Sequence, residues 1–220
     1  MCKKRKSIFF QVIISHNKPP LKTVLPSNII QKPGIQKLTE NSIVFKNGDI
    51  EQADVLMLCT GYRYKFPFLT GDCEVNIEDE RVTPLYKHII HTTFPTLSFI
   101  GICKTICPFP QFENQVRFVL ATLDGSFPLP SAKEMDLDIQ QDYKKRLSEG
   151  LPPRYAHTMG PRQWAYNDDL AEMGQFEPIP KAVQCLYDEV HGVRVVDLPN
   201  YKKKLYRLTG DETFEEIPCT

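Results

Sequence analysis

Two apolar runs associated with glycine are the features of this sequence most suggestive of chemistry. The first, residues 55–59, is followed directly by Thr60, Gly61 and Tyr62, and the second, residues 95–103, contains Gly101. An unalternating apolar run is typical of a strand covered on both faces of a parallel sheet, and ligands bind outside the carboxyl ends of such strands. Because glycine has no side chain, the backbone can approach a ligand there. We therefore predict ligand-binding turns at both glycines. At Gly61, a positive-φ turn without a ligand is an equally weighted alternative.

The residues after the second run strengthen its prediction. The segment PFPQFENQVRFVLATLDG has apolar residues at helical spacing and stops at Asp124-Gly125, which predicts a helix that begins near Pro108. The free N–H groups and the positive dipole end of that helix would face a ligand at the sheet edge. The predicted buried stripe comprises Phe112, Val116, Val119, Leu120 and Leu123.

Other reactive side chains do not form a recognisable site. His88 and His91 are three residues apart, but no carboxylate or cysteine completes a metal set at known spacing, so we assign them surface or packing roles and predict no metal site. The seven cysteines are an odd number without a C-x-x-C pair. We interpret them as free thiols in a reducing compartment. The spacing of Cys103 and Cys107 also disfavours a redox pair of the disulfide-reductase kind.

Composition narrows the classes of partner. The 220 residues carry 27 basic and 27 acidic side chains, and this balance gives no support to a nucleic-acid or membrane-surface partner. No apolar run reaches the ~20 residues of a membrane span. The amino-terminal basic head followed by residues 8–14 resembles a signal peptide, but Gln11 interrupts it and no cleavage site follows. We therefore predict a buried strand there and a cytoplasmic protein.

The remaining elements can be predicted from local signals. Asn47-Gly48 between two short alternating runs predicts a hairpin that leads into a strand at 54–59. Ser131 and Glu134 have the spacing of a capping box, which predicts a helix that Gly150 ends. A second helix is predicted from Pro180 to Gly192.

Several separate blocks of the chain resemble one enzyme family. The blocks are the stretch from NIIQKPG to CTGYRYKFPFL, then LYKHIIHTTFPTLSFIGI, CPFPQFENQ and LPSAKEM. Together they resemble the carboxyl-terminal half of a class B flavin-containing monooxygenase, with the senecionine N-oxygenase type of insects as the nearest subtype. The blocks fit Baeyer-Villiger and ornithine N-hydroxylating monooxygenases less well.

The resemblance implies an α/β fold, a partial two-dinucleotide-binding, Rossmann-like architecture with a helical carboxyl-terminal region. It implies a remnant of the NADPH-binding domain at residues 1–53, the end of the FAD-binding domain at 54–130 and a helical tail at 131–220. FAD and NADPH are the implied cofactors. The implied substrate is a small amine or thioether, and a homodimer is an expected assembly. No catalytic side chain is implied, because the cofactor carries the chemistry.

The resemblance also implies which residues face the cofactors. Thr60, Gly61 and Tyr62 would lie at the junction of the two domains, and Gly101 would end the strand nearest the flavin. Pro108, Phe109 and Gln111 would face the pyrimidine edge of the ring, where a helix N-terminus stabilises negative charge. For Phe109 and Phe112 a plain core role is the alternative. Trp164 or Tyr166 would line a substrate pocket, with Trp164 as an anchor of the tail on the core as the alternative.

The chain departs from the family in one important respect. None of its eleven glycines stand in a G-x-G arrangement, so the two G-x-G-x-x-G loops that hold the pyrophosphates of FAD and NADPH are absent. We therefore expect a truncated family member that is inactive by itself. The alternative, from a different functional class, is a catalytically dead fragment that acts as an interaction or regulatory protein.

Overall fold

The computed structural model describes residues 11–218 and divides the chain into two compact units. Residues 1–60 and 181–220 belong to unit 1, and residues 61–180 belong to unit 2. This division differs from the boundaries at 53/54 and 130/131, which follow the cofactor domains that the family resemblance implies. Those domain boundaries stay a prediction. The predicted strand at residues 8–14 lies partly outside the described residues, and its described part is strand from Val12 onward.

Unit 1 contains short sheets and one long helix. Its elements are β1 (Val12–His16), β2 (Ile29–Pro33), β3 (Ile35–Leu38), β4 (Ile43–Phe45), β5 (Ile50–Glu51), α4 (Lys181–Val196), β10 (Leu205–Leu208) and β11 (Phe214–Ile217). Strands β1 and β2 pair in parallel, β3, β4 and β5 form an antiparallel sheet, and β10 and β11 form a hairpin. The hairpin predicted at Asn47-Gly48 is confirmed as β4–β5, although Gly48 alone takes a positive φ. Helix α4 continues through Gly192, the predicted stop.

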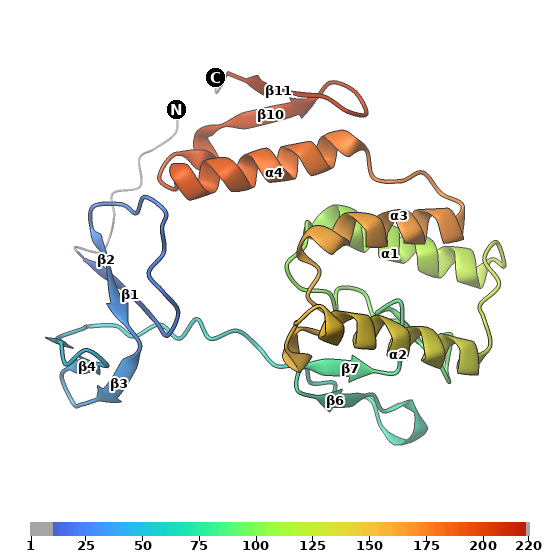
Figure 1. Ribbon diagram of the computed structural model, residues 1–220, viewed down its shortest axis with the longest axis horizontal. Coiled ribbons are helices and arrows are strands. Elements are labelled where there is room, and N and C mark those ends of the chain that lie inside the picture. The colour runs from blue at the N-terminus through green and yellow to red at the C-terminus, as the bar shows by residue number, and fades with distance from the viewer. Residues whose placement is uncertain (1–10, 219–220) are drawn as a thin grey trace. The chain divides into compact units, whose positions relative to one another are not determined.

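Unit 2 combines three α-helices with short strands, and both clusters of buried side chains described below lie in it (Figure 1). Its elements are β6 (Asn76–Glu78), β7 (Arg81–Thr83), β8 (Leu85–Tyr86), β9 (Ile90–His91), α1 (Pro108–Leu123), α2 (Ala132–Ser148) and α3 (Gln163–Gly174). The capping box at Ser131 and Glu134 is confirmed, since each residue's side chain bonds the other's backbone N–H. Helices α1 and α3 lie side by side.

Two clusters of buried side chains hold unit 2 together. One gathers residues from β8, β9, the turn between them and the three helices: Tyr86, Ile89, Ile90, Phe118, Met135 and Leu170. The other lies under the loop after Gly61 and comprises Val82, Leu85, Phe99 and Ile102, with the half-buried Tyr64 and Phe66 packed against them. Burial of these side chains provides the main favourable free energy for folding this unit.

Two predicted strands do not form. Residues 54–59 belong to no strand, and Val55, Leu56, Met57 and Leu58 are all exposed. Residues 95–103 make only an isolated bridge between Ser98 and Ile90, although Phe99, Ile102 and Cys103 are buried there. A strand needs a neighbouring strand for its backbone hydrogen bonds, and residues 54–59 have none among residues 11–218. Residues 95–103 meet the short strand β9 only briefly, where the His91 N–H donates to the Leu97 carbonyl and the Phe99 N–H donates to the Ile89 carbonyl. The predictions failed because an apolar run indicates that a segment tends to be buried, but it does not show that a neighbouring strand is available for pairing.

Candidate functional site

The turn at Gly101 is fixed by its backbone conformation and by a close neighbour. Gly101 has φ of +88°, and a Cβ added there would meet two ring atoms of Phe112 at 3.3 Å. Its N–H donates to Oε1 of Gln115 at 3.0 Å, which ties the turn to α1. Only glycine satisfies both constraints without strain.

Replacing Gly101 should lower the free energy of unfolding for two reasons, the left-handed backbone and the contact with Phe112, and a control variant can separate them. We expect Gly101→Ala to lower the free energy of unfolding by about 2 kcal/mol, about half of it from the left-handed backbone and the rest from contact with Phe112. Gly125→Ala is a matched control, since Gly125 has φ of +85° and nothing lies within 4 Å of an added Cβ. Urea unfolding measures both. Equal losses in the two variants would show that the Phe112 contact has no effect.

The first turn of α1 offers fewer donors than the sequence suggested. Cys107 is its N-cap, without a side-chain cap, and the Cys107 N–H donates to Oε1 of Gln163. Pro108 and Pro110 have no N–H, and the Gln111 N–H is 3.4 Å from the Cys107 carbonyl oxygen. The expectation of several free N–H groups is therefore wrong: the described contacts leave the Phe109 N–H as the open donor of this turn. The positive dipole end remains.

Gln111 is the most informative side chain at this helix end. It is 1% exposed, and neither its amide nitrogen nor its amide oxygen has a hydrogen bond of good geometry in the described part of the chain, although the amide lies close enough to the Cys103 thiol to act on it weakly. A buried amide without partners costs free energy, on the order of 1–3 kcal/mol for each group, so a native structure rarely retains one without a reason. Phe109, two residues earlier, is 84% exposed, which argues against its core alternative.

Buried amides also join α1 to α3. Asn114 donates to the Asn167 carbonyl at 3.3 Å, and Asn167 donates in turn to the Gln163 carbonyl at 2.7 Å. Gln115 donates to the Tyr166 hydroxyl at 3.0 Å, and that hydroxyl donates to the Lys87 carbonyl at 2.8 Å. Burial raises the pKa of the neighbouring Cys103 thiol to about 12, so this cysteine stays protonated.

The apolar stripe predicted for α1 does not face this interface. Val116, Leu120 and Leu123 are exposed, whereas Gln111, Asn114, Gln115, Phe118 and Ala121 are buried. The prediction was wrong for Val116, Leu120 and Leu123 because it assumed that apolar residues mark the buried face. Here amide side chains share the buried face with Phe118 and Ala121. Of the predicted stripe, Val119 packs against the core cluster and Phe112 lies against Gly101, and the other three residues face outward.

Thr60, Gly61 and Tyr62, the other predicted cofactor residues, show among the described residues none of the close contacts found at the start of α1. Thr60 is the last residue of the first segment of unit 1, and Gly61 and Tyr62 begin unit 2. Gly61 has φ of +82°, nothing lies within 4 Å of an added Cβ, and Tyr62 is 99% exposed. The described contacts do not bring this triplet to Gly101 or Gln111, and they agree with the alternative of a positive-φ turn.

His88, one of the two histidines to which the sequence analysis assigned surface or packing roles, belongs to a buried chain of hydrogen bonds with His157. The Val82 N–H donates to Nε2 of His157 at 2.8 Å, and Nδ1 of His157 lies 2.9 Å from Nδ1 of His88. Burial lowers the pKa of His88 to about 3 and that of His157 to about 2, with a smaller contribution from nearby cations. Both rings are therefore neutral near neutral pH. His157 lies far from His88 in sequence, so no local motif could have revealed the pair.

His91 has a separate, local role: its Nδ1 accepts from the N–H groups of Thr93 and Phe94 at 3.2 Å. Across residues 11–218 no group of three or more histidine, cysteine, aspartate or glutamate side chains is placed to hold a metal ion. No helix in the same range is both long and apolar enough to cross a bilayer.

These residues fit one part of a flavin and not another. A turn of bare backbone, one open N–H at a positive helix end and a partnerless buried amide suit the polar edge of a flavin ring, which offers both carbonyl and N–H groups. A pyrophosphate needs several converging backbone N–H groups, and a helix start with two prolines cannot supply them.

Known proteins resemble the chain throughout this region. The family model described as flavin-binding monooxygenase-like matches residues 2–215. Two flavin-containing monooxygenases of Arabidopsis thaliana, FMO GS-OX-like 4 and FMO GS-OX-like 2, are 40% and 44% identical over 153 and 144 residues. Each alignment covers 64% of this chain and 34% or 31% of the relative. The chain thus spans about a third of the length of these curated relatives.

Solved structures resemble the fold. The S-allyl-L-cysteine S-oxygenase of Allium sativum matches with a TM-score of 0.76 and 35% identity, over 88% of this chain and 45% of that one. Tmm from Pelagibacter sp. strain HTCC7211 matches with a TM-score of 0.77 at 22% identity, over 95% of this chain and 47% of that one, and it supports the fold alone. The mixed strands and helices are therefore those of a partial α/β flavin-binding fold, as predicted. FAD and NADPH are the cofactors of the family that these matches share. The match over residues 2–215 shows that the chain belongs to this flavin-binding monooxygenase-like family.

Proposed function

We propose that the chain is part of a flavin-dependent monooxygenase that uses FAD, NADPH and O2 to transfer one oxygen atom to a soft nucleophile, a thioether or a tertiary amine. The family match over residues 2–215 carries this proposal. The thioether is the first choice because one structural neighbour is named as an S-oxygenase. The insect N-oxygenase subtype and a homodimer stay predictions.

The residues at the start of α1 would hold the polar edge of the flavin ring. Bound FAD supplies the redox chemistry, and these side chains position it. The Phe109 N–H and the helix dipole would stabilise negative charge at that edge, and the buried Gln111 amide would gain the partners that it lacks in the described chain. Gly101 and Pro108 would shape the turn, while Thr60, Gly61 and Tyr62 would lie at the junction of the two cofactor domains.

We further propose that the 220 residues alone bind FAD weakly or not at all. Because the sequence has no G-x-G, neither pyrophosphate would find a glycine loop. We expect gel filtration of the purified chain with added FAD to give a colourless protein peak, without the flavin band near about 450 nm. A flavin band that co-elutes with the protein would contradict weak binding and would justify an NADPH oxidation assay on the chain itself.

A chimera tests the oxygenase function separately from cofactor affinity. In the S-oxygenase of Allium sativum, the segment that aligns with this chain would be replaced by this chain. We expect the chimera to purify with FAD and to convert a thioether to its sulfoxide with NADPH. Gln111→Leu, which keeps the volume and removes the amide, should lower FAD retention. A FAD-loaded chimera that oxidises NADPH and oxygenates neither a thioether nor a tertiary amine would refute the proposal.

A second candidate function is that of an interaction protein without catalysis. The exposed apolar residues of α1 and of segment 55–58 favour it, because surfaces of this kind often mark binding sites for another protein. Its test is to add the purified chain to a full-length family enzyme. Co-elution together with loss of the enzyme's activity would support this function, and unchanged elution and activity would reject it.

A further inference from the structure

A cavity of about 720 Å³ lies within unit 2, and no residue of α1 belongs to its lining. Its lining residues come from β7, β8, α2, α3 and the loops before α3. The volume is in the range of sites for small organic molecules, about 300–1,000 Å³. The apolar part of the lining includes Leu85, Ile139 and Met159, so the cavity can receive a hydrocarbon group. Tyr166, one of the two residues that the family resemblance placed at a pocket, lines this cavity.

Charge in the cavity is mostly paired. Lys87 pairs with Asp138 at 2.8 Å and Arg146 with Asp142 at 2.7 Å, and Arg162 pairs with Glu149. The full lining holds five basic and four acidic side chains, and its two histidines are neutral. The cavity therefore carries a surplus of one positive charge.

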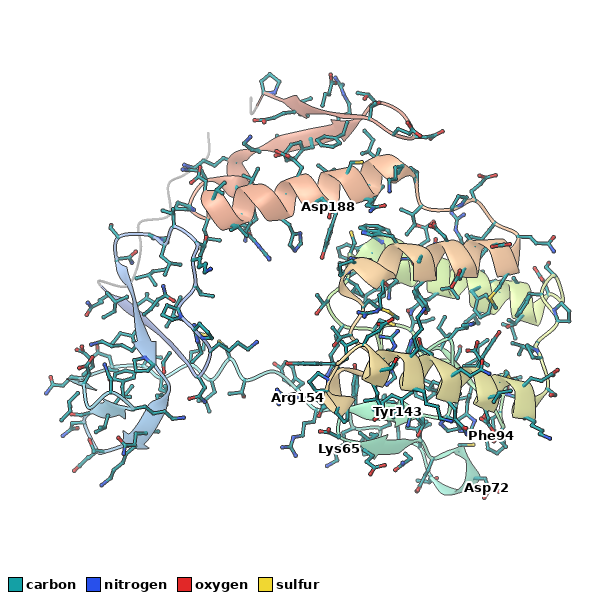
Figure 2. The ribbon with its side chains drawn as sticks, viewed as in Figure 1. Lys65, Asp72, Phe94, Tyr143, Arg154 and Asp188 are labelled. Atoms are coloured by element: carbon teal, nitrogen blue, oxygen red, sulfur yellow. The ribbon has the colours of Figure 1, made fainter. Side chains whose placement is uncertain are left out.

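Two cations of the lining, Arg81 and Lys145, have no ion pair among the described residues, and Arg81 is the less exposed of the two. Its guanidinium lies 3.7 Å from the centre of the Tyr143 ring, and Tyr143 belongs to α2 (Figure 2). The side chain of Arg81 has no ion pair or hydrogen bond among the described residues, and Glu78 and Asp142 act on it only at longer range. The pKa of Arg81 is lowered, mainly because its guanidinium is partly buried. Stacking occupies the face of the guanidinium and leaves its in-plane N–H groups for an oxyanion, which they fit as a fork.

A second donor belongs to the same cavity. Because Nε2 of His157 accepts from Val82, the neutral His157 carries its proton on Nδ1 and donates to Nδ1 of His88. The neutral His88 must then carry its proton on Nε2. That N–H has Asp142 Oδ2 at 3.6 Å, too far for a good hydrogen bond, and the Arg146 Nη2 donor at 3.3 Å. The His88 Nε2–H therefore lacks a well-placed acceptor among residues 11–218.

From these observations we propose that the cavity is a binding site for a small organic oxyanion with an apolar body, such as a short-chain carboxylate. The Arg81 fork holds the charged oxygens, His88 Nε2–H adds a neutral donor, and the apolar lining covers the hydrocarbon part. Binding needs neither FAD nor NADPH, so the proposal stands apart from the proposed oxygenase function.

The test compares hexanoate with hexanamide, which has nearly the same shape and no charge. Isothermal titration calorimetry on the whole 220-residue chain, without cofactors, measures both. We expect hexanoate to bind at least about tenfold more tightly than hexanamide, since the in-plane fork recognises charge. Arg81→Gln should weaken hexanoate at least about tenfold and leave hexanamide unchanged, and Arg81→Lys should fall between Arg81→Gln and the wild type.

Arg154→Gln is the matched control. Arg154 also lies near an aromatic ring, that of Tyr155, but it is exposed and does not line the cavity. We expect this variant to keep hexanoate affinity within about twofold. Each variant must unfold in urea with the wild-type transition before its affinity is compared. Equal affinity for hexanoate and hexanamide, no binding of either, or an Arg81→Gln variant that binds hexanoate like the wild type would each overturn the proposal.

Discussion

Acidification from about pH 7 to about pH 5 should lower the free energy of unfolding of unit 2 by about 4 kcal/mol. The cause is the buried pair His88 and His157, whose pKa values fall to about 3 and about 2. An unfolded histidine titrates near 6.5. Between those values the unfolded chain binds up to two more protons than the folded one, so stability falls as the pH falls. Each histidine contributes about 2 kcal/mol over this range.

Urea unfolding followed by fluorescence of Trp164, the single tryptophan, measures this loss in unit 2. His157→Gln should roughly halve the loss between the two pH values, because glutamine keeps an acceptor for the Val82 N–H and does not titrate. The positive charges of Arg146, Lys87, Arg81 and Lys104 act in the same direction on one or both rings. A wild-type loss below about 1 kcal/mol would show that the rings are not buried as described.

Loss of the Arg146 guanidinium should be the most destabilising single change in α2. This side chain is 7% exposed and donates from Nε to Asp142 at 2.7 Å and from Nη1 to the Thr158 carbonyl at 2.8 Å. We expect Arg146→Met, which keeps most of the volume, to cost about 3 kcal/mol. This loss of unfolding free energy is smaller than the largest losses seen when a buried ion pair is broken, because Asp142 is 41% exposed and water can solvate it in the variant.

The chain offers a matched control for this change. Arg117 pairs with Glu113 at the same i,i+4 spacing on α1, but the two side chains are 46% and 61% exposed. Arg117→Met should therefore change the free energy of unfolding by less than about 0.5 kcal/mol. Urea unfolding of both variants, compared at one pH, separates burial from pairing. Similar losses in the two variants would contradict the importance that we give to burial.

Local signals in the sequence were enough to place several elements. The capping box at Ser131, the Asn47-Gly48 hairpin and the start of α1 at Pro108 follow from residues within a few positions of each other. Such features depend on the chain's own backbone geometry, which the sequence states directly. The glycine turn at Gly101 belongs to this group as well, because its positive φ needs only one residue type.

Features that depend on distant partners could not be predicted in the same way. The pairing of His88 with His157 and of Gln115 with Tyr166 joins residues that only the folded chain brings together. The buried face of α1 was misassigned because Asn114 and Gln115 on this face bond to residues of α3, and the periodicity of apolar residues does not record such bonds. Strands at 54–59 and 95–103 were expected from composition alone, which says nothing about an available neighbour.

The extended segment from Val55 to Leu58 has a consequence for how the chain behaves at high concentration. Four consecutive apolar residues are exposed, and their backbone pairs with no strand in the part of the chain that the structure describes. Copies of such a segment can align edge to edge, and their side chains can interlock in a dry interface. The chain therefore carries a built-in tendency to self-associate, and a single charged residue placed within this run would act as a gatekeeper against it.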